Sequence, residues 1–109
     1  MDWVTVDEES VRGRFARMAE FGSLDPAEPH CWEYRAGGPS PADLKRLGDR
    51  LTEQGFTVQE PRVVPGSFGY CMSMERVQIH TPESMIALWR ELAALAEEYG
   101  VNWGDYSVR

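Results

Sequence analysis

Two segments of this 109-residue chain begin with the same helix-start signal, a hydroxyl residue followed by proline and then an acid. They are Ser40-Pro41-Ala42-Asp43 and Thr81-Pro82-Glu83. The hydroxyl oxygen can accept a hydrogen bond from a backbone N–H of the first turn, and proline suits the first helical position because no N–H partner is needed there. Apolar residues at helical spacing follow both signals. The sequence therefore predicts two helices, which end near Gly55 and Gly100.

Four segments around these helices show the period of two that is typical of half-buried strands. They cover residues 30–36, 56–60, 68–80 and 101–108. The resulting order, β-α-β-β-α-β, is that of the ferredoxin-like split βαβ arrangement. We therefore predict an α+β fold with a four-stranded antiparallel sheet of order 4-1-3-2 and both helices on one face.

An extra helix is predicted ahead of this module, over residues 7–21. Asp7 can cap it, and apolar residues recur on one of its faces. We expect residues 1–28 to form this helix and a Pro-containing connector. Residues 29–109 then form the ferredoxin-like domain, and the whole chain has the length of one domain rather than two.

The alternation predicts which strand side chains face the helices. The inward set is apolar and comprises Trp32, Tyr34, Phe56, Val58, Tyr70, Met72 and Met74. The open face is polar and carries Glu33, Arg35, Thr57, Gln59, Ser73 and Glu75. In the last strand, alternation separates Trp103 from Tyr106 unless Gly104 forms a bulge. We expect Trp103 to lie in the core and Tyr106 to be accessible.

The charge balance bears on the kind of partner. The chain has 11 basic and 18 acidic residues, a net charge of −7. Direct binding of nucleic acid is not expected, because proteins that bind it concentrate lysine and arginine. An acidic protein suits a basic protein partner, since complementary fields speed association, although acidity also keeps a protein soluble. No signal-peptide pattern or membrane-length apolar run is present, so we expect no membrane contact and a cytoplasmic location.

Few residues here have the potential to bind metal. Cys31 and Cys71 are predicted to be free thiols, because two cysteines in a reducing compartment rarely form a scaffold. His30 and His80 are expected to be solvated at strand edges. Their spacing with the cysteines matches no regular zinc pattern. We therefore expect neither a metal nor a cofactor.

Signatures of catalysis are also sparse. The chain has no Gly-rich phosphate loop and no Gly-x-Ser-x-Gly nucleophile elbow. Glu33 and Glu75 are possible cross-strand neighbours that acid–base chemistry could use. An ion-paired sheet surface with Arg35 and Arg76 is the more common role of such residues. We therefore predict no catalytic residues.

Three stretches carry a resemblance to a known family. They are HCWEYR at the first strand, SPADLKRLGDRLTEQGFTV at the first capped helix, and ESMIALWRELAALAEEYGVNWGDYSV at the end. In the last stretch, Leu95-Ala96-Glu97-Glu98-Tyr99 fits the family's helix end. Asn102-Trp103-Gly104-Asp105-Tyr106 has the residue types of its Tyr-Asp-Gly-Trp cluster in altered order. Over roughly residues 30 to 108 the chain resembles the RraB family, the regulators of ribonuclease E activity type B.

The resemblance implies a ferredoxin-like fold and a non-catalytic protein that inhibits ribonuclease E by binding its C-terminal scaffold part. We expect the partner-binding surface to comprise Glu33, Arg35, Glu75 and Tyr106. Two other readings stay open. One is an immunity-type or other small binding protein with a different target, and the other is a small-ligand-binding domain or enzyme that uses the sheet face.

Overall fold

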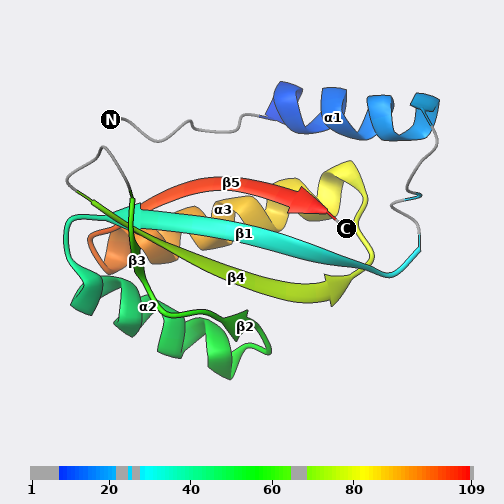
Figure 1. Cartoon of the computed structure of the whole chain (residues 1–109). Coiled ribbons are helices and arrows are strands. Elements are labelled where there is room, and N and C mark those ends of the chain that lie inside the picture. The colour runs from blue at the N-terminus through cyan, green and yellow to red at the C-terminus, as the bar shows by residue number, and fades with distance from the viewer. Residues whose placement is uncertain (1–7, 22–24, 26–27, 65–68, 109) are drawn as a thin grey trace.

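The computed structural model describes residues 8–21, 25, 28–64 and 69–108 (Figure 1). Within these residues the elements are α1 (Glu8–Phe21), β1 (His30–Gly38), α2 (Pro41–Glu53), β2 (Thr57–Val58), β3 (Arg62–Val63), β4 (Tyr70–Gln78), α3 (Pro82–Glu98) and β5 (Asn102–Val108). The three helices and the order of the main strands agree with the prediction. Asp7, the predicted cap of α1, lies outside the described residues.

Both predicted helix starts are confirmed. The Ser40 side chain accepts a hydrogen bond from the Asp43 backbone N–H. Thr81 accepts from the Ser84 N–H, and the Ser84 side chain accepts from the Thr81 N–H, which completes a capping box. Gly100 follows α3 with a φ of +73°, a left-handed conformation that glycine adopts without steric cost.

The sheet is antiparallel, with the order β2-β4-β1-β5 along its hydrogen-bonded path. One strand was not predicted. The two-residue β3 also pairs with β4, through Arg62 opposite Cys71 and Val63 opposite Tyr70. For this segment the sequence predicts a connection that contains Pro61 and Pro65, because two residues are too few to show a period of two. The strand predicted over 56–60 is likewise shorter, at Thr57–Val58.

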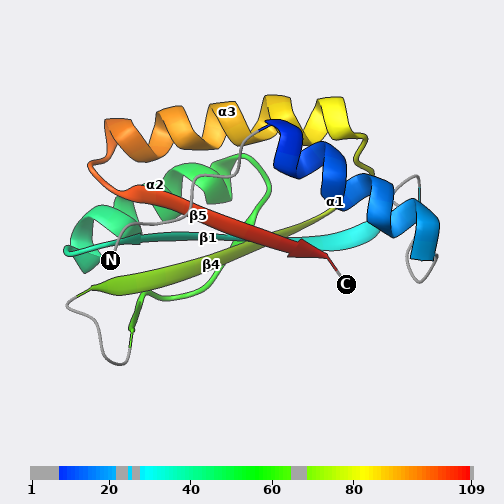
Figure 2. The same ribbon diagram turned by 90° about the horizontal axis from the view of Figure 1, so that it is seen from above.

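Helices α2 and α3 pack on the same face of the sheet (Figure 2). The contacts agree, because Trp89 of α3 packs on Trp103 of β5, whose ring in turn lies 6.2 Å from that of Tyr34 in β1. On the α2 side, a Cβ added at Gly48 would lie 2.9 Å from Val58 and 3.1 Å from the Met72 sulfur. A side chain is therefore excluded at Gly48 by the close approach of α2 to the sheet.

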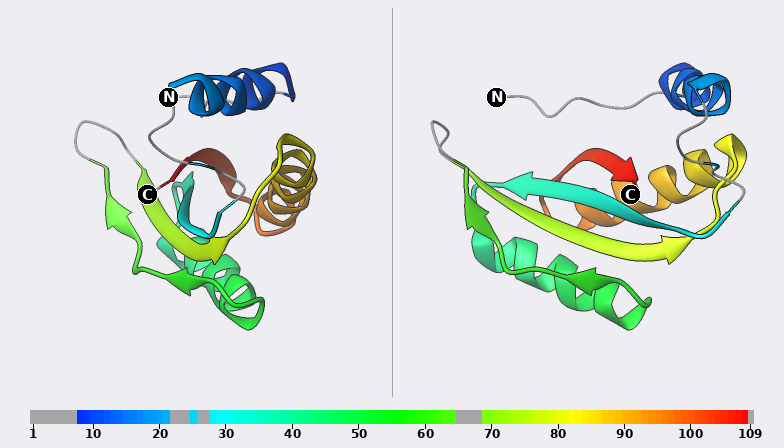
Figure 3. Two further views of the ribbon diagram at one scale, coloured as in Figure 1. Left: turned by 90° about the vertical axis from the view of Figure 1, so that its right-hand side faces the viewer. Right: turned by 45° about the vertical axis from the view of Figure 1, so that its right-hand side comes forward.

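One apolar cluster fills the space between the helices and the sheet. Five of the seven side chains predicted to face inward are buried, and Val58 and Tyr70 are partly buried against them. Helix α1 lies beside α3 and β5 (Figure 3). It joins the same cluster through Val11 and Phe15, and the Phe15 ring stacks on Trp32 at 5.7 Å. No helix in the described part of the chain is long and apolar enough to cross a membrane.

Candidate protein-binding site

The sheet face opposite the helices carries a group of charged residues from neighbouring strands. Glu33 of β1 lies directly opposite Glu75 of β4 on one side and Ser107 of β5 on the other. Arg35, two residues along β1, lies opposite Ser73. The structure therefore brings together three of the four predicted site residues, Glu33, Arg35 and Glu75, and all three are half-buried.

Arg35 connects two strands on this face. Its Nη2 donates to Glu33 Oε1 at 3.0 Å and to Ser107 Oγ at 3.3 Å. A single ion pair at a partly exposed surface stabilises a protein only slightly. The ion pair instead fixes the position of a side chain. The Arg35 guanidinium holds the Glu33 carboxylate in a defined place beside Glu75 on the neighbouring strand.

The fourth predicted residue, Tyr106, is not accessible, which corrects the prediction. Its side chain is 3% exposed and that of Trp103 is 8% exposed. Tyr34 pairs with Tyr106 while Ala36 pairs with Trp103, so Arg35 alone stands opposite two residues of β5, Gly104 and Asp105. The sequence allows a bulge at Gly104, and the bulge found here shifts the alternation by one residue. Both aromatic side chains, Trp103 and Tyr106, therefore face the core.

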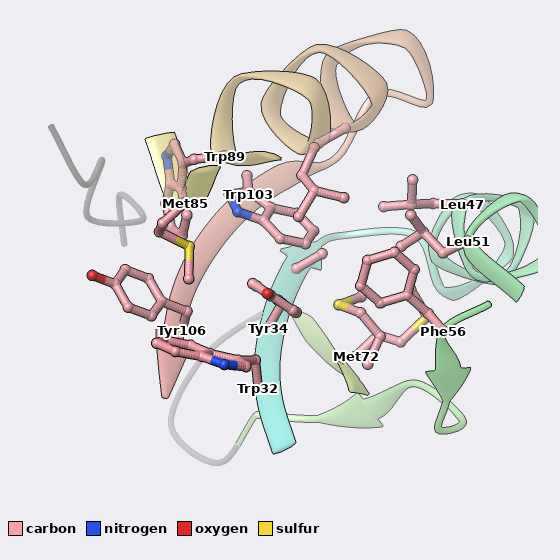
Figure 4. Packing of buried hydrophobic residues seen from close by; sticks show 14 of the residues in the cluster. Trp32, Tyr34, Leu47, Leu51, Phe56, Met72, Met85, Trp89, Trp103 and Tyr106 are labelled. Carbon is pink, nitrogen blue, oxygen red and sulfur yellow. The ribbon is translucent and has the colours of Figure 1, made fainter. Parts of the chain in front are cut away.

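Packing around Tyr106 explains why it is enclosed. Its ring lies 5.6 Å from that of Trp89, and the two rings meet edge to face (Figure 4). Arg14 of α1 lies over the other side, with its guanidinium carbon 4.6 Å from the ring centre, and its Nη1 donates to the Tyr106 carbonyl at 3.3 Å. Tyr106 is therefore a contact between β5, α3 and α1, and not a handle for a partner.

His80 also departs from expectation, since only 3% of it is exposed. Its Nε2 is 2.9 Å from Tyr34 Oη, and its Nδ1 is 2.9 Å from Ser84 Oγ. The Trp32 ring meets the imidazole edge to face at 4.9 Å. Burial lowers the pKa of His80 to about 4, with a further contribution from the charge of Arg76. The alternation at the end of β4 gave no signal for this environment, which depends on α3 folding back over the sheet.

Cys31 and Cys71 are not joined in a disulfide, as predicted. Cys31 pairs with Val77 and Cys71 with Gly37, so the two thiols lie toward opposite ends of β1 and β4. Burial raises the pKa of the Cys71 thiol, which lowers its reactivity at neutral pH. Within the described residues, no group of three or more histidine, cysteine or acidic side chains is placed to hold a metal ion.

Two exposed apolar residues on the same sheet face were not singled out from the sequence. Val77, in β4, is 68% exposed, and Ile79, just after β4, is 56% exposed. The signal was present, because the alternation that places Glu75 on the open face places Val77 there too.

These features define a small α+β protein with helices on one face of an antiparallel sheet and a mixed charged and apolar surface on the other. A scan against protein-family models matches "Regulator of ribonuclease activity B", RraB, over residues 8–106. Because the match covers most of the chain, the protein belongs to the RraB family, and the resemblance seen in the sequence is confirmed. The match begins earlier than that resemblance and includes α1. A search of the curated proteins found no match.

Family membership defines the kind of activity. RraB proteins are non-catalytic regulators that act by binding ribonuclease E. The protein is thus a regulator of ribonuclease E and its partner is that enzyme. Which surface makes the contact is a separate question, to which the geometry of the open face is relevant.

Proposed function

We propose that the protein inhibits ribonuclease E by docking the open face of its sheet on the enzyme, with Glu33, Arg35 and Glu75 in the contact. The interaction takes place in the cytoplasm, where the enzyme acts, and involves no chemical step by the regulator. Inhibition then depends on occupancy, so it follows the concentration of regulator relative to enzyme.

The observation that carries this proposal is the direct opposition of Glu33 and Glu75 across β1 and β4. Two carboxylates held side by side on the sheet surface form a local concentration of negative charge, which attracts a cationic group of a partner. The net charge of −7 adds a long-range attraction for a basic surface. Both features favour a partner segment rich in lysine or arginine.

We also infer that β1-α2-β2-β4-α3-β5 is a ferredoxin-like module and that residues 29–109 form the binding domain. The strand order and the packing of α2 and α3 on one face support this inference. In this arrangement residues 1–28 contribute α1, which closes one end of the core, and the opposite face remains available for the enzyme.

The test is a ribonuclease E cleavage assay with purified regulator added. The Glu33→Lys/Glu75→Lys double variant should inhibit at least tenfold less well than the unaltered protein. Glu91→Lys/Glu97→Lys is the matched control, because both residues are exposed on α3 and the change in net charge is identical. The control should inhibit within twofold of the unaltered protein.

The melting temperature of each variant shows whether it is folded. If the α3 variant loses inhibition while the sheet variant keeps it, the enzyme binds the helical side and the proposed surface is wrong. If the unaltered protein neither binds nor inhibits the enzyme, the proposed inhibition itself is wrong.

A further inference from the structure

Large apolar side chains are exposed at three positions in the described part of the chain: Val63, Val77 and Ile79. Exposed apolar residues that occur singly are normal on protein surfaces, and Val63 on β3 is one of these. Val77 and Ile79 differ because they are two residues apart: Val77 is in β4 and Ile79 follows the strand by one residue, so a continuation of the same alternation puts the two side by side. They continue the line of Ser73 and Glu75 along the same strand.

The backbone beside this apolar pair is also unusual. The last pair between β2 and β4 joins Thr57 to Glu75, and no described strand pairs with Arg76–Gln78 on that side. The Gln59 N–H donates to the Ser73 carbonyl at 2.9 Å, so the odd-numbered residues of β4 direct their backbone groups toward β2. By the same alternation, the N–H and C=O of Val77 point beyond the end of β2, to an open sheet edge.

Charge lies next to this edge. Glu75 precedes Val77 on the same face, and Glu33 lies across from Glu75 on β1. A segment that runs along the end of β4 therefore meets an aliphatic pair and then two carboxylates. We call the surface formed by Glu33, Glu75, Val77 and Ile79 the β4 strip.

We propose that the β4 strip seats an extended segment of ribonuclease E in which an apolar side chain is followed closely by lysine or arginine. This inference rests on the proposed function and specifies the partner's chemistry. The apolar side chain packs on Val77 and Ile79, and the basic side chain reaches the Glu33 and Glu75 carboxylates. Backbone hydrogen bonds to the free edge at Val77 fix the direction of the segment, as in other cases of strand addition.

Charge complementarity selects this occupant over a second copy of the chain. A second copy brings the same acidic strip and the same net charge of −7, which opposes self-association through this face. A basic segment gains from both features. Salt also affects the two kinds of contact differently. Screening weakens the contribution of ion pairs to affinity and leaves that of buried apolar surface intact.

The experiment compares two double variants in the full chain. In the first variant, Val77→Thr/Ile79→Thr, the side chains keep their β-branched shape and strand preference but lose apolar surface. Val63→Thr is the matched control, because Val63 is 65% exposed and lies away from the strip. The dissociation constant for ribonuclease E should rise at least tenfold in the first variant and stay within twofold in the control.

A charge variant, Glu33→Gln/Glu75→Gln, separates the two parts of the strip. It should weaken binding at low salt and reduce the dependence of the dissociation constant on salt concentration. The threonine variant should keep that dependence. Should the threonine pair cause unfolding, Ile79→Thr alone gives the same comparison, because Ile79 lies outside β4.

The outcomes separate a failure of the β4 strip proposal from a failure of the proposed docking through the open face. Unchanged affinity in the threonine variant, with lost affinity in the glutamine variant, overturns the apolar anchor and keeps the charged face. Unchanged affinity in both, with tight binding by the unaltered chain, removes the whole open face from the contact. A peptide array of ribonuclease E supplies the partner side: acidic peptides as the strongest binders would also overturn the proposal.

Discussion

At the scale of the residue, His80 connects the end of β4 to the start of α3 through a chain of hydrogen bonds. The Gln78 amide, oriented to suit its neighbours, donates to Tyr34 Oη at 2.7 Å. Tyr34 Oη lies 2.9 Å from His80 Nε2, and His80 Nδ1 lies 2.9 Å from Ser84 Oγ, so an imidazole protonated at Nδ1 alone accepts from the tyrosine and donates to the serine. Every step is satisfied with a neutral imidazole. A second proton on Nε2 would face the Tyr34 hydroxyl proton, which agrees with a pKa lowered to about 4.

Stability should therefore fall as the pH is lowered through the window between the two pKa values of His80. Above about pH 6.5 the imidazole is neutral in both states and contributes no pH dependence. Between that value and the folded pKa of about 4, the unfolded chain takes up a proton that the folded chain does not. The loss of unfolding free energy reaches on the order of 3 kcal/mol at the acid end.

Urea unfolding from pH 7.5 to pH 4.5 measures this effect. The carboxylates also titrate in part of the window, so the useful quantity is the difference from His80→Gln, which has no imidazole to protonate. The variant should be less stable at pH 7.5 and should lose less stability on acidification. Parallel pH profiles for the two proteins would show that His80 is not the group responsible.

At the scale of the element, the helices and the position of the last strand were predictable, but the direction in which the aromatic side chains of that strand face was not. Ser40 and Thr81 act within three residues of themselves, so the sequence holds all the information that their caps need. The bulge in β5 depends on how β1 pairs with it, and the burial of His80 depends on α3. Such contacts join residues far apart in the chain, and a local pattern cannot report them. The open face could be predicted in position, as Glu33 and Glu75 demonstrate, but Tyr106 could not.

The caps support a direct prediction. Ser40→Ala and Thr81→Ala should each lower the unfolding free energy by about 0.5–2 kcal/mol, because a backbone N–H of the first turn loses its acceptor. The two effects should be similar, because Thr81→Ala removes the acceptor of the Ser84 N–H but leaves the bond from the Thr81 N–H to Ser84 Oγ in place. Thr52→Ala is the control, because its hydroxyl bonds only to the Gly48 carbonyl within α2. Equal stability of all three variants would contradict the role given to the caps.

The bulge in β5 supports a second prediction for this element. Trp103→Ala and Tyr106→Ala should both lower the unfolding free energy by about 3–5 kcal/mol, as large aromatic truncations in a core do. Asn102→Ala, at an exposed position of the same strand, should have little effect. Chemical unfolding followed by fluorescence gives all three values. If Tyr106→Ala matched Asn102→Ala, the bulge would not turn Tyr106 inward.

At the scale of the whole molecule, α1 precedes the sheet in the sequence but packs against the same core as the other helices. Phe15 stacks on Trp32, and Arg14 covers Tyr106. Surface ion pairs join α1 to α3, where Arg12 Nη1 lies 2.9 Å from Glu83 Oε1. The family match, which begins at residue 8, spans the same helix. Since α1 lies on the covered side of the sheet, it can stabilise the regulator without blocking the open face.

This arrangement predicts that α1 unfolds together with the sheet. Phe15→Ala should lower the unfolding free energy of the entire chain by about 3–5 kcal/mol, because it removes a ring packed on the central strand. Circular dichroism and tryptophan fluorescence should still report one coincident transition, as expected for a single cooperative unit. Arg12→Ala, which removes two solvent-exposed ion pairs, to Glu8 and to Glu83, should leave that transition nearly unchanged. An early loss of helix signal in Phe15→Ala, ahead of an unaltered fluorescence transition, would mean that α1 is a separate appendage. Binding to ribonuclease E by folded Phe15→Ala should equal that of the unaltered chain, because the contact proposed above lies on the opposite face of the sheet.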